Sequence, residues 1–225
     1  MKAFTLALSL LIAFAAAANE FPVSSLNNHE ETSLIQDFEA EPSLRHGRRL
    51  QTGPNAAQRK TTWTNAHNDM REKYQVEFGG EYVPLTWNTE LKAEAEAFAK
   101  TLVSTCVNRR PKAAENPNDY GVNSAMRAQT RDFLSPVKVM SMWENKLGLG
   151  WPKNGVFTQV LWSKTQYFAC ADASSPLENE KKCTASVCFY AKAGNCAFGR
   201  FDGDYEQAVI SGPACSTTCP SNVEC

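Results

Sequence analysis

The hydrophobic pattern of the chain is helical in its first half. Apolar residues recur every three to four positions in three segments, which predicts helices over residues 61–78, 89–106 and 137–147. Asn88 and Ser135 stand before the second and third segments and have side chains typical of helix N-caps. The first helix is expected to start at one threonine of a short cluster and to end at a glycine pair: Thr61, Thr62 or Thr64, and Gly79-Gly80.

The pattern after residue 150 changes to an alternation of apolar and polar positions. Three such runs predict strands: VFTQVLW at 156–162, TQYFACAD at 165–172 and TASVCFYA at 184–191. On the first strand, Val156 would share one face with Thr158, Val160 and Trp162. Helices followed mostly by strands indicate an α+β domain built in layers.

The N-terminal region has the composition of processed segments. Residues 1–18 combine Lys2, an apolar run and three alanines, which predicts a signal peptide and an extracellular protein without a membrane span. Residues 19–49 are acidic and poor in aromatic residues, which is typical of a disordered pro-segment. This segment ends at Arg48-Arg49, a dibasic pair that suits proteolytic processing. A single domain is expected from Leu50 onward.

The cysteines fit an oxidising compartment. All eight lie after residue 100, and an even number in a secreted chain predicts four disulfides. The alternative is a zinc site, because Cys215, Cys219 and Cys225 have loosely metal-like spacing.

Charge and histidine content exclude several functions. Residues 50–225 contain 19 Lys and Arg against 18 Asp and Glu, a balance that disfavours nucleic acid or an anionic membrane as partner. His67 is the only histidine in this region, so one chain cannot build a zinc site from two or three histidines. A nucleophilic relay would have to use His67, which we interpret as a structural residue on the inner side of its helix.

Four motifs resemble the CAP superfamily of cysteine-rich secretory proteins, antigen 5 and pathogenesis-related 1 proteins. They are AHNDMR at 66–71, PLTWNTEL at 84–91, GVFTQVLW at 155–162 and CFYAKAGN at 188–195. The resemblance covers about residues 61–225 and implies a disulfide-stabilised three-layer α-β-α sandwich. It places the CAP (SCP) domain at residues 50–210 and a cysteine-rich extension at 211–225.

Family members usually carry two histidines and two glutamates in a central cleft, where they hold a divalent metal. The matching positions here are Arg110, Val122, Lys146 and Val156, none of which is a usual ligand. The resemblance therefore implies a degenerate metal site without a cofactor, with His67, Thr158 and Gln159 as neighbours in the cleft. Inside such a cleft Lys146 would pair with Glu144 or Glu115, receive an anion, or extend to water. Asp119, Glu115 and Glu144 are the carboxylates that a different alignment would bring to the site.

The resemblance also suggests a disulfide pairing. The expected bonds are Cys106–Cys170, Cys183–Cys188, Cys196–Cys215 and Cys219–Cys225.

A secreted, non-enzymatic binding or effector scaffold is the function that these observations favour, with an extracellular protein as partner. A sterol- or fatty-acid-binding protein is the alternative, and a secreted hydrolase is a third. The segment LGLGWPKNG at 147–155 would either contact lipid through Leu149 and Trp151 or pack Trp151 on the core.

Overall fold

The computed structural model describes residues 55–129, 133–179 and 181–224, all of which belong to one compact unit, Leu50–Cys225. The expected signal peptide and pro-segment lie outside the described residues. None of the described helices is long and apolar enough to cross a membrane.

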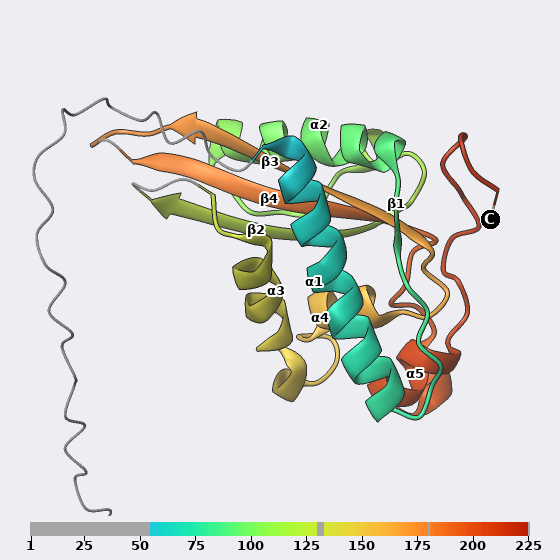
Figure 1. The fold of residues 1–225 in the computed structure, drawn as a ribbon. Helices are drawn as coiled ribbons and strands as arrows, with labels where there is room; N and C mark the ends of the chain where they lie inside the picture. Colours follow the sequence, from blue (N-terminus) through green and yellow to red (C-terminus); the bar gives the residue numbers. More distant parts are fainter. Residues whose placement is uncertain (1–54, 130–132, 180, 225) are drawn as a thin grey trace, which may run out of the picture. The chain divides into compact units, whose positions relative to one another are not determined.

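A four-stranded sheet forms the centre of this unit (Figure 1). Its order is β1-β3-β4-β2, with β1 parallel to β3 and the other neighbours antiparallel. The strands are β1 (Thr86–Trp87), β2 (Gly121–Gln129), β3 (Tyr167–Pro176) and β4 (Lys182–Ala191). The helices are α1 (Ala56–Glu77), α2 (Thr89–Thr105), α3 (Pro136–Glu144), α4 (Gly155–Leu161) and α5 (Tyr205–Ser211), with 3₁₀ turns at Ala113–Glu115, Leu147–Leu149 and Phe198–Phe201.

Helices cover both faces of the sheet, which confirms the three-layer α-β-α arrangement. The apolar stripe of α2 packs on alternate residues of β3 and β4, among them Ala171 and Phe189. The opposite face, which includes Phe168 and Tyr190, packs against α1, α3 and α4 (Figure 1). The buried residues of β3 and β4 therefore alternate along each strand between two separate cores.

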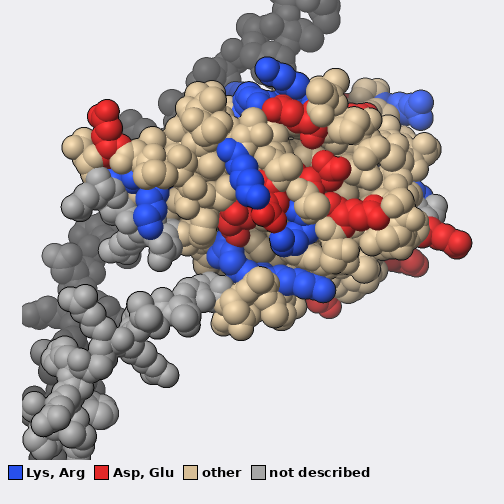
Figure 2. All heavy atoms as spheres, turned by 90° about the horizontal axis from the view of Figure 1, so that it is seen from above, with Lys and Arg blue, Asp and Glu red and all other residues tan. Residues whose placement is uncertain are grey.

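The outer side of α2 is solvated and carries charges of both signs (Figure 2). Glu96 pairs with Lys92 and with Lys100 at 2.9 Å in both cases, one helical turn to either side. The view shows no large area of a single sign, in agreement with the balanced composition.

Two of the expected helix starts are confirmed, and the first is wrong. The side chain of Asn88 accepts hydrogen bonds from the amides of Glu90 and Leu91, and Ser135 caps α3 in the same manner. Helix α1 instead begins at Ala56, five residues before the threonine cluster, and Asn55 is its N-cap. Residues 56–60 show no periodic apolar pattern, so the sequence did not predict this first turn.

The threonine cluster and the end of α3 also differ from the expectation. The hydroxyls of Thr61, Thr62 and Thr64 donate to carbonyls one turn earlier instead of capping α1. Helix α3 ends at Glu144, and a 3₁₀ turn follows at Leu147–Leu149.

The stretch 156–162 is mostly helix α4, so the expected strand is wrong. Phe157, Val160 and Leu161 are fully buried, and their spacing is that of one helical face. A short, continuous apolar run fits a buried strand and a buried helix equally well. Packing against α1 and α5 decides for the helix, and Val156, Thr158, Val160 and Trp162 consequently do not share one face.

The disulfides correct two of the expected pairs. The structure joins Cys106 to Cys183 and Cys170 to Cys188, and it confirms Cys196–Cys215. The reason is strand parity: Cys183 lies in the core under α2, whereas Cys170 and Cys188 belong to the opposite core. Cys170 and Cys188 are direct partners in the register of β3 and β4. The expected Cys219–Cys225 pair involves Cys225, which lies outside the described residues.

Candidate functional site

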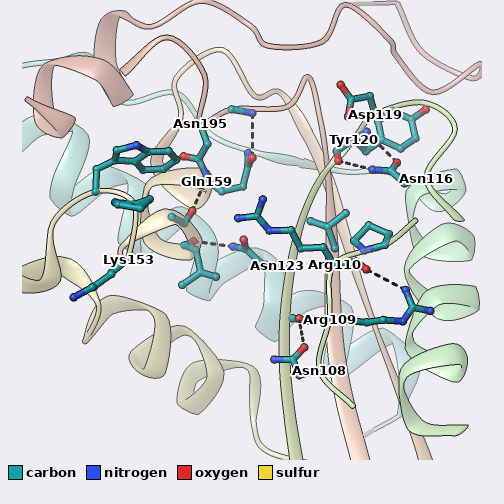
Figure 3. A pocket seen from close by; sticks show the side chains of 18 residues that line it. Asn108, Arg109, Arg110, Asn116, Asp119, Tyr120, Asn123, Lys153, Gln159 and Asn195 are labelled. Carbon is teal, nitrogen blue, oxygen red and sulfur yellow. Dashed lines mark hydrogen bonds between the residues drawn. The ribbon is translucent and has the colours of Figure 1, made fainter. Parts of the chain in front are cut away.

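A polar cavity of about 710 Å³ opens where β2 begins, beside the N-terminus of α4 (Figure 3). Its walls come from the loop before β2, the first residues of β2, the loop leading into α4, and the Gly194-Asn195 turn after β4. Its lining includes the side chains of Arg110, Asp119, Val122, Asn123, Trp151, Lys153, Val156, Gln159 and Asn195.

Three amide side chains of the cavity are fixed by hydrogen bonds to the protein. Gln159 accepts from the amide of Gly194 at 3.1 Å and donates to Thr165 at 3.3 Å. Asn195 accepts from the hydroxyl of Thr158 at 2.6 Å and donates to the carbonyl of Gly155 at 2.6 Å. These bonds hold the amides in place before any ligand arrives.

Asn123 is the third fixed amide, and its neighbour Gly121 explains the close packing of this wall. Asn123 donates from Nδ2 to the carbonyl of Val156 at 2.7 Å and to the hydroxyl of Tyr190 at 3.3 Å. A Cβ atom at Gly121 would lie only 2.3 Å from Oε1 of Gln159. Only glycine therefore fits at the start of β2 without displacing Gln159.

Two adjacent arginines differ in their partners. Arg109 turns toward α2 and forms a bidentate ion pair with Glu115, with both N–O distances at 2.6 Å (Figure 3). This pair, followed by the amide of Lys112, lowers the pKa of Glu115 to about 2. Arg110 instead points its guanidinium toward Asn123 and Gln159 (Figure 3). Among residues 55–129, 133–179 and 181–224, no ion pair reaches the side chain of Arg110.

The structure brings three of the four positions matched to the family's metal ligands to this cavity. Arg110, Val122 and Val156 line it. Lys146 is exposed and lies outside the lining, so it reaches water instead of an anion in the cleft. Its expected partners are engaged elsewhere, Glu115 with Arg109 and Glu144 with α1.

Glu144 joins α3 to α1. It accepts from the hydroxyl of Tyr74 at 2.7 Å and from the ammonium of Lys73 at 3.0 Å. These two donors lower the pKa of the Glu144 carboxyl.

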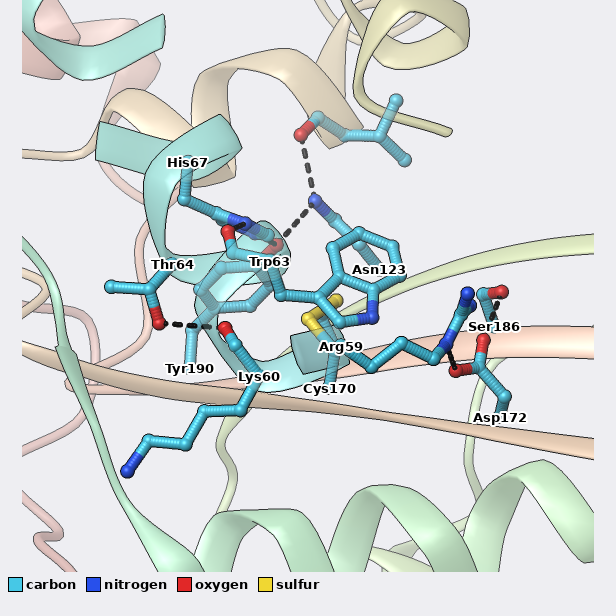
Figure 4. The surroundings of a disulfide bond; sticks show 12 residues. Arg59, Lys60, Trp63, Thr64, His67, Asn123, Cys170, Asp172, Ser186 and Tyr190 are labelled. Carbon is cyan, nitrogen blue, oxygen red and sulfur yellow. Dashed lines mark hydrogen bonds and ion pairs between the residues drawn. A yellow bond between two sulfur atoms is a disulfide. The ribbon is translucent and has the colours of Figure 1, made fainter. Parts of the chain in front are cut away.

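His67 does not line the cavity and is fully buried, beside Trp63 and Tyr190 (Figure 4). Its Nδ1 donates to the carbonyl of Trp63 at 2.8 Å, because a carbonyl can only accept. Nε2 then accepts from the hydroxyl of Tyr190 at 2.9 Å. Burial lowers the pKa of His67 to about 3; the hydrogen bond to Trp63 opposes this shift, and the charge of Arg71 adds to it. The imidazole is therefore neutral, and both of its nitrogens are occupied by structural hydrogen bonds.

Trp151 forms one wall of the cavity. Its ring stacks on Phe198 with centroids 3.7 Å apart and planes inclined by 18°, and 38% of the residue stays exposed. Trp151 is therefore packed on an aromatic neighbour while part of it stays exposed, and lipid contact by this loop stays a prediction. Leu149 is 52% exposed and does not line the cavity.

The lining does not fit a divalent cation. Asp119 is its one carboxylate, and it stands with the cations Arg110 and Lys153 and with no histidine or cysteine. Among the described residues, the only group of three clustered His, Cys, Asp or Glu side chains is His67, Cys170 and Cys188. The two sulfurs of this group are joined in a disulfide.

Part of this site could be predicted from the sequence. Four residues that were expected in the cleft line the cavity: Arg110, Val122, Val156 and Gln159. Thr158 does not line it, but its hydroxyl donates a hydrogen bond to Asn195, which does. Asn123 and Asn195 were not expected as site residues, and Trp151 was expected only as a lipid contact or as a residue packed on the core. Asn195 ends the CFYAKAGN motif and Asn123 follows Val122, which was matched to a ligand position, and this was the available signal.

Comparisons with known proteins identify the family. A family model described as the cysteine-rich secretory protein family (CAP) matches residues 64–190, more than half of the chain. The chain therefore belongs to the CAP family.

Several individual proteins are similar to this chain. Venom allergen 5 of Vespula vidua is 31% identical over 153 residues, which cover 57% of this chain and 71% of the relative. Fruiting body protein SC14 of Schizophyllum commune is 28% identical over 183 residues, with coverage of 74% and 78%. Pathogenesis-related protein 1C of Nicotiana tabacum is 30% identical over 118 residues, with coverage of 48% and 62%. The solved structure of BmVAL-1 matches with a TM-score of 0.50 at 16% identity, covering 64% of this chain and 82% of that chain, which supports the fold.

Proposed function

We propose that this protein is an extracellular, non-enzymatic binding protein whose cavity takes a small polar anion in place of a divalent metal. The observation that carries the proposal is Arg110, whose guanidinium points into the cavity and has no ion pair among the described residues. Val122 and Val156 stand beside it where the family resemblance places metal ligands. Aliphatic groups cannot coordinate a metal, and a guanidinium repels a cation.

Arg110 is suited to an anion by its shape as well as its charge. A guanidinium offers parallel N–H donors that match the two oxygens of a carboxylate. Hydrogen bonds to charged groups contribute roughly 1.5–3 kcal/mol, which corresponds to about a 10- to 150-fold change in affinity. Because Arg110 is exposed at the cavity mouth, the lower part of this range applies.

The absence of enzymatic activity is supported by the state of the nucleophiles and bases. His67 is the only histidine between residues 50 and 225, and it is neutral, buried and hydrogen bonded on both sides. No free cysteine occurs among the described residues. A relay of the serine- or cysteine-hydrolase type would need an accessible base that His67 does not provide.

The extracellular location is supported by the disulfides. Three bonds connect elements of the described fold, and such bonds persist in oxidising compartments.

A sterol or fatty acid is the alternative ligand, and the exposed Leu149 and Trp151 favour it. The cavity itself argues for a polar ligand, because amide and charged side chains fill much of its lining. A lipid would leave these groups unpaired when it displaced their water.

Calorimetric titration tests the proposal with citrate, a small tricarboxylate, and with zinc chloride in a separate experiment. Citrate should bind one to one, and Arg110→Gln should weaken it by about tenfold. Lys146→Gln is the matched control, since it removes the same charge from an exposed site outside the cavity. Zinc binding at micromolar affinity, or citrate affinity that is equal in both variants, would contradict the proposal.

A further inference from the structure

The fixed amides of the cavity keep unused donors and acceptors. An Asn or Gln side chain offers two N–H donors and two acceptor lone pairs. After the bonds described above, Gln159 and Asn195 each retain one N–H and one lone pair. Asn123 uses both of its N–H donors within the protein and offers its carbonyl oxygen.

This mixture of donors and acceptors indicates a ligand rich in hydroxyl groups. Each hydroxyl both donates and accepts, so it can satisfy an amide N–H and an amide oxygen side by side. An inorganic anion such as sulfate only accepts, and it would leave the oxygens of Asn123 and Asp119 without a donor. The cavity thus offers more acceptors than a simple anion can use.

Trp151 adds a flat apolar surface to this polar wall. Stacking on Phe198 fixes the plane of the indole, and its exposed part borders the same cavity. A preformed aromatic surface next to hydrogen-bonding groups suits a ligand with one apolar face and a polar rim. Pyranose rings have this character, because their C–H groups lie on one face and their hydroxyls at the edge.

We propose that the cavity recognises an acidic oligosaccharide, with a uronic acid carboxylate on Arg110 and a pyranose ring against Trp151. This inference rests on the proposed function and specifies its ligand class. Gln159, Asn195 and Asn123 bind the ring hydroxyls, and Asp119 accepts from a further hydroxyl. The volume of about 710 Å³ lies within the range of roughly 300–1,000 Å³ that is usual for small-molecule sites, and it accommodates more than one sugar unit.

The test uses two trisaccharides that differ only at C6, a galacturonic acid trimer and the galactose trimer of the same linkage. Both are titrated calorimetrically into the purified protein. The acidic trimer should bind about tenfold more tightly. Arg110→Gln should remove this difference, whereas Lys146→Gln should preserve it.

Trp151→Ala should weaken the binding of both trimers at least about fivefold, and Trp151→Phe should restore most of the affinity. Leu149→Ala is the matched control in the same loop, because Leu149 is exposed outside the cavity. Circular dichroism confirms that each variant is folded before the titration. If Trp151→Ala is unfolded, Trp151→Leu replaces it, because leucine keeps an apolar contact with Phe198 but removes the flat ring, and it should show the same loss relative to Leu149→Ala.

The anion site and the oligosaccharide ligand are separate proposals, and the experiments distinguish the failure of one from the failure of the other. If citrate or a triglutamate peptide binds through Arg110 and neither trimer binds, the anion site stands and the saccharide assignment is wrong. If both trimers bind equally, the carboxylate is not recognised and the assignment to Arg110 is wrong. If no anion of any kind depends on Arg110, the proposed function fails together with this inference.

Discussion

Acid should destabilise this protein through His67. The imidazole is fully buried and neutral, with a pKa of about 3 in the folded state against 6.5 in the unfolded chain. Below pH 6.5 the unfolded chain binds a proton that the folded chain refuses, so the free energy of unfolding falls as the pH falls toward 3. Each pH unit in this window costs about 1.4 kcal/mol, which gives about 2 kcal/mol between pH 7 and pH 5.

Urea denaturation at pH 7, 6 and 5, followed by tryptophan fluorescence, measures this loss. The control is His67→Gln, in which an amide can donate to the carbonyl of Trp63 and accept from Tyr190. This variant should be less stable at pH 7 but nearly independent of pH over the same interval. His29 and His46 are unchanged in it, so the difference between the two slopes isolates His67. Equal slopes, or an imidazole proton resonance of His67 that titrates near pH 6.5, would refute the reasoning.

Three other predictions concern packing, covalent links and the metal positions. Gly121→Ala should displace Gln159 and lower stability by about 1–3 kcal/mol, whereas Gly148→Ala, whose Cβ meets nothing within 4 Å, should change stability little in the same thermal melts. Non-reducing peptide mapping should recover Cys106 linked to Cys183. Replacing both residues by serine should cost about 4 kcal/mol, because the bond closes a loop of 77 residues, and a peptide that links Cys106 to Cys170 would overturn the parity argument. The triple variant Arg110→His, Val122→Glu and Val156→His should bind zinc in calorimetry, since all three positions line the cavity. Lys146→Glu with Val156→His should not, since Lys146 lies outside it.

Sequence patterns predicted the parts of this fold that have local signals. Asn88 and Ser135 were identified as caps because their side chains act on amides two or three residues away. The layered α+β class followed from the change of period along the chain. Strand β2 was not identified, since Gly121–Gln129 has small and polar residues that gain their order from pairing with β4.

The wrong predictions concern residues whose structure is decided by tertiary contacts. The segment Gly155–Leu161 contains β-branched residues that favour a strand, yet it packs as a buried helix between α1 and α5. The cysteine pairing depended on strand parity and register, which placed Cys183 under α2 and Cys170 on the far side of the sheet. Lys146 was placed in the cleft by alignment alone, and the early end of α3 leaves it exposed.

The most direct test of the central claim is a titration of ¹⁵N-labelled protein with citrate, followed by two-dimensional NMR. The account predicts that the Nε–H signal of Arg110, the side-chain amides of Gln159 and Asn195 and the backbone amide of Gly194 shift together in one saturable transition. These groups surround the cavity, whereas Lys146 lies outside it and its amide should stay unchanged. Shifts that leave the Arg110 signal unmoved, or that are as large at Lys146 as at Arg110, would contradict an anion site in this cavity.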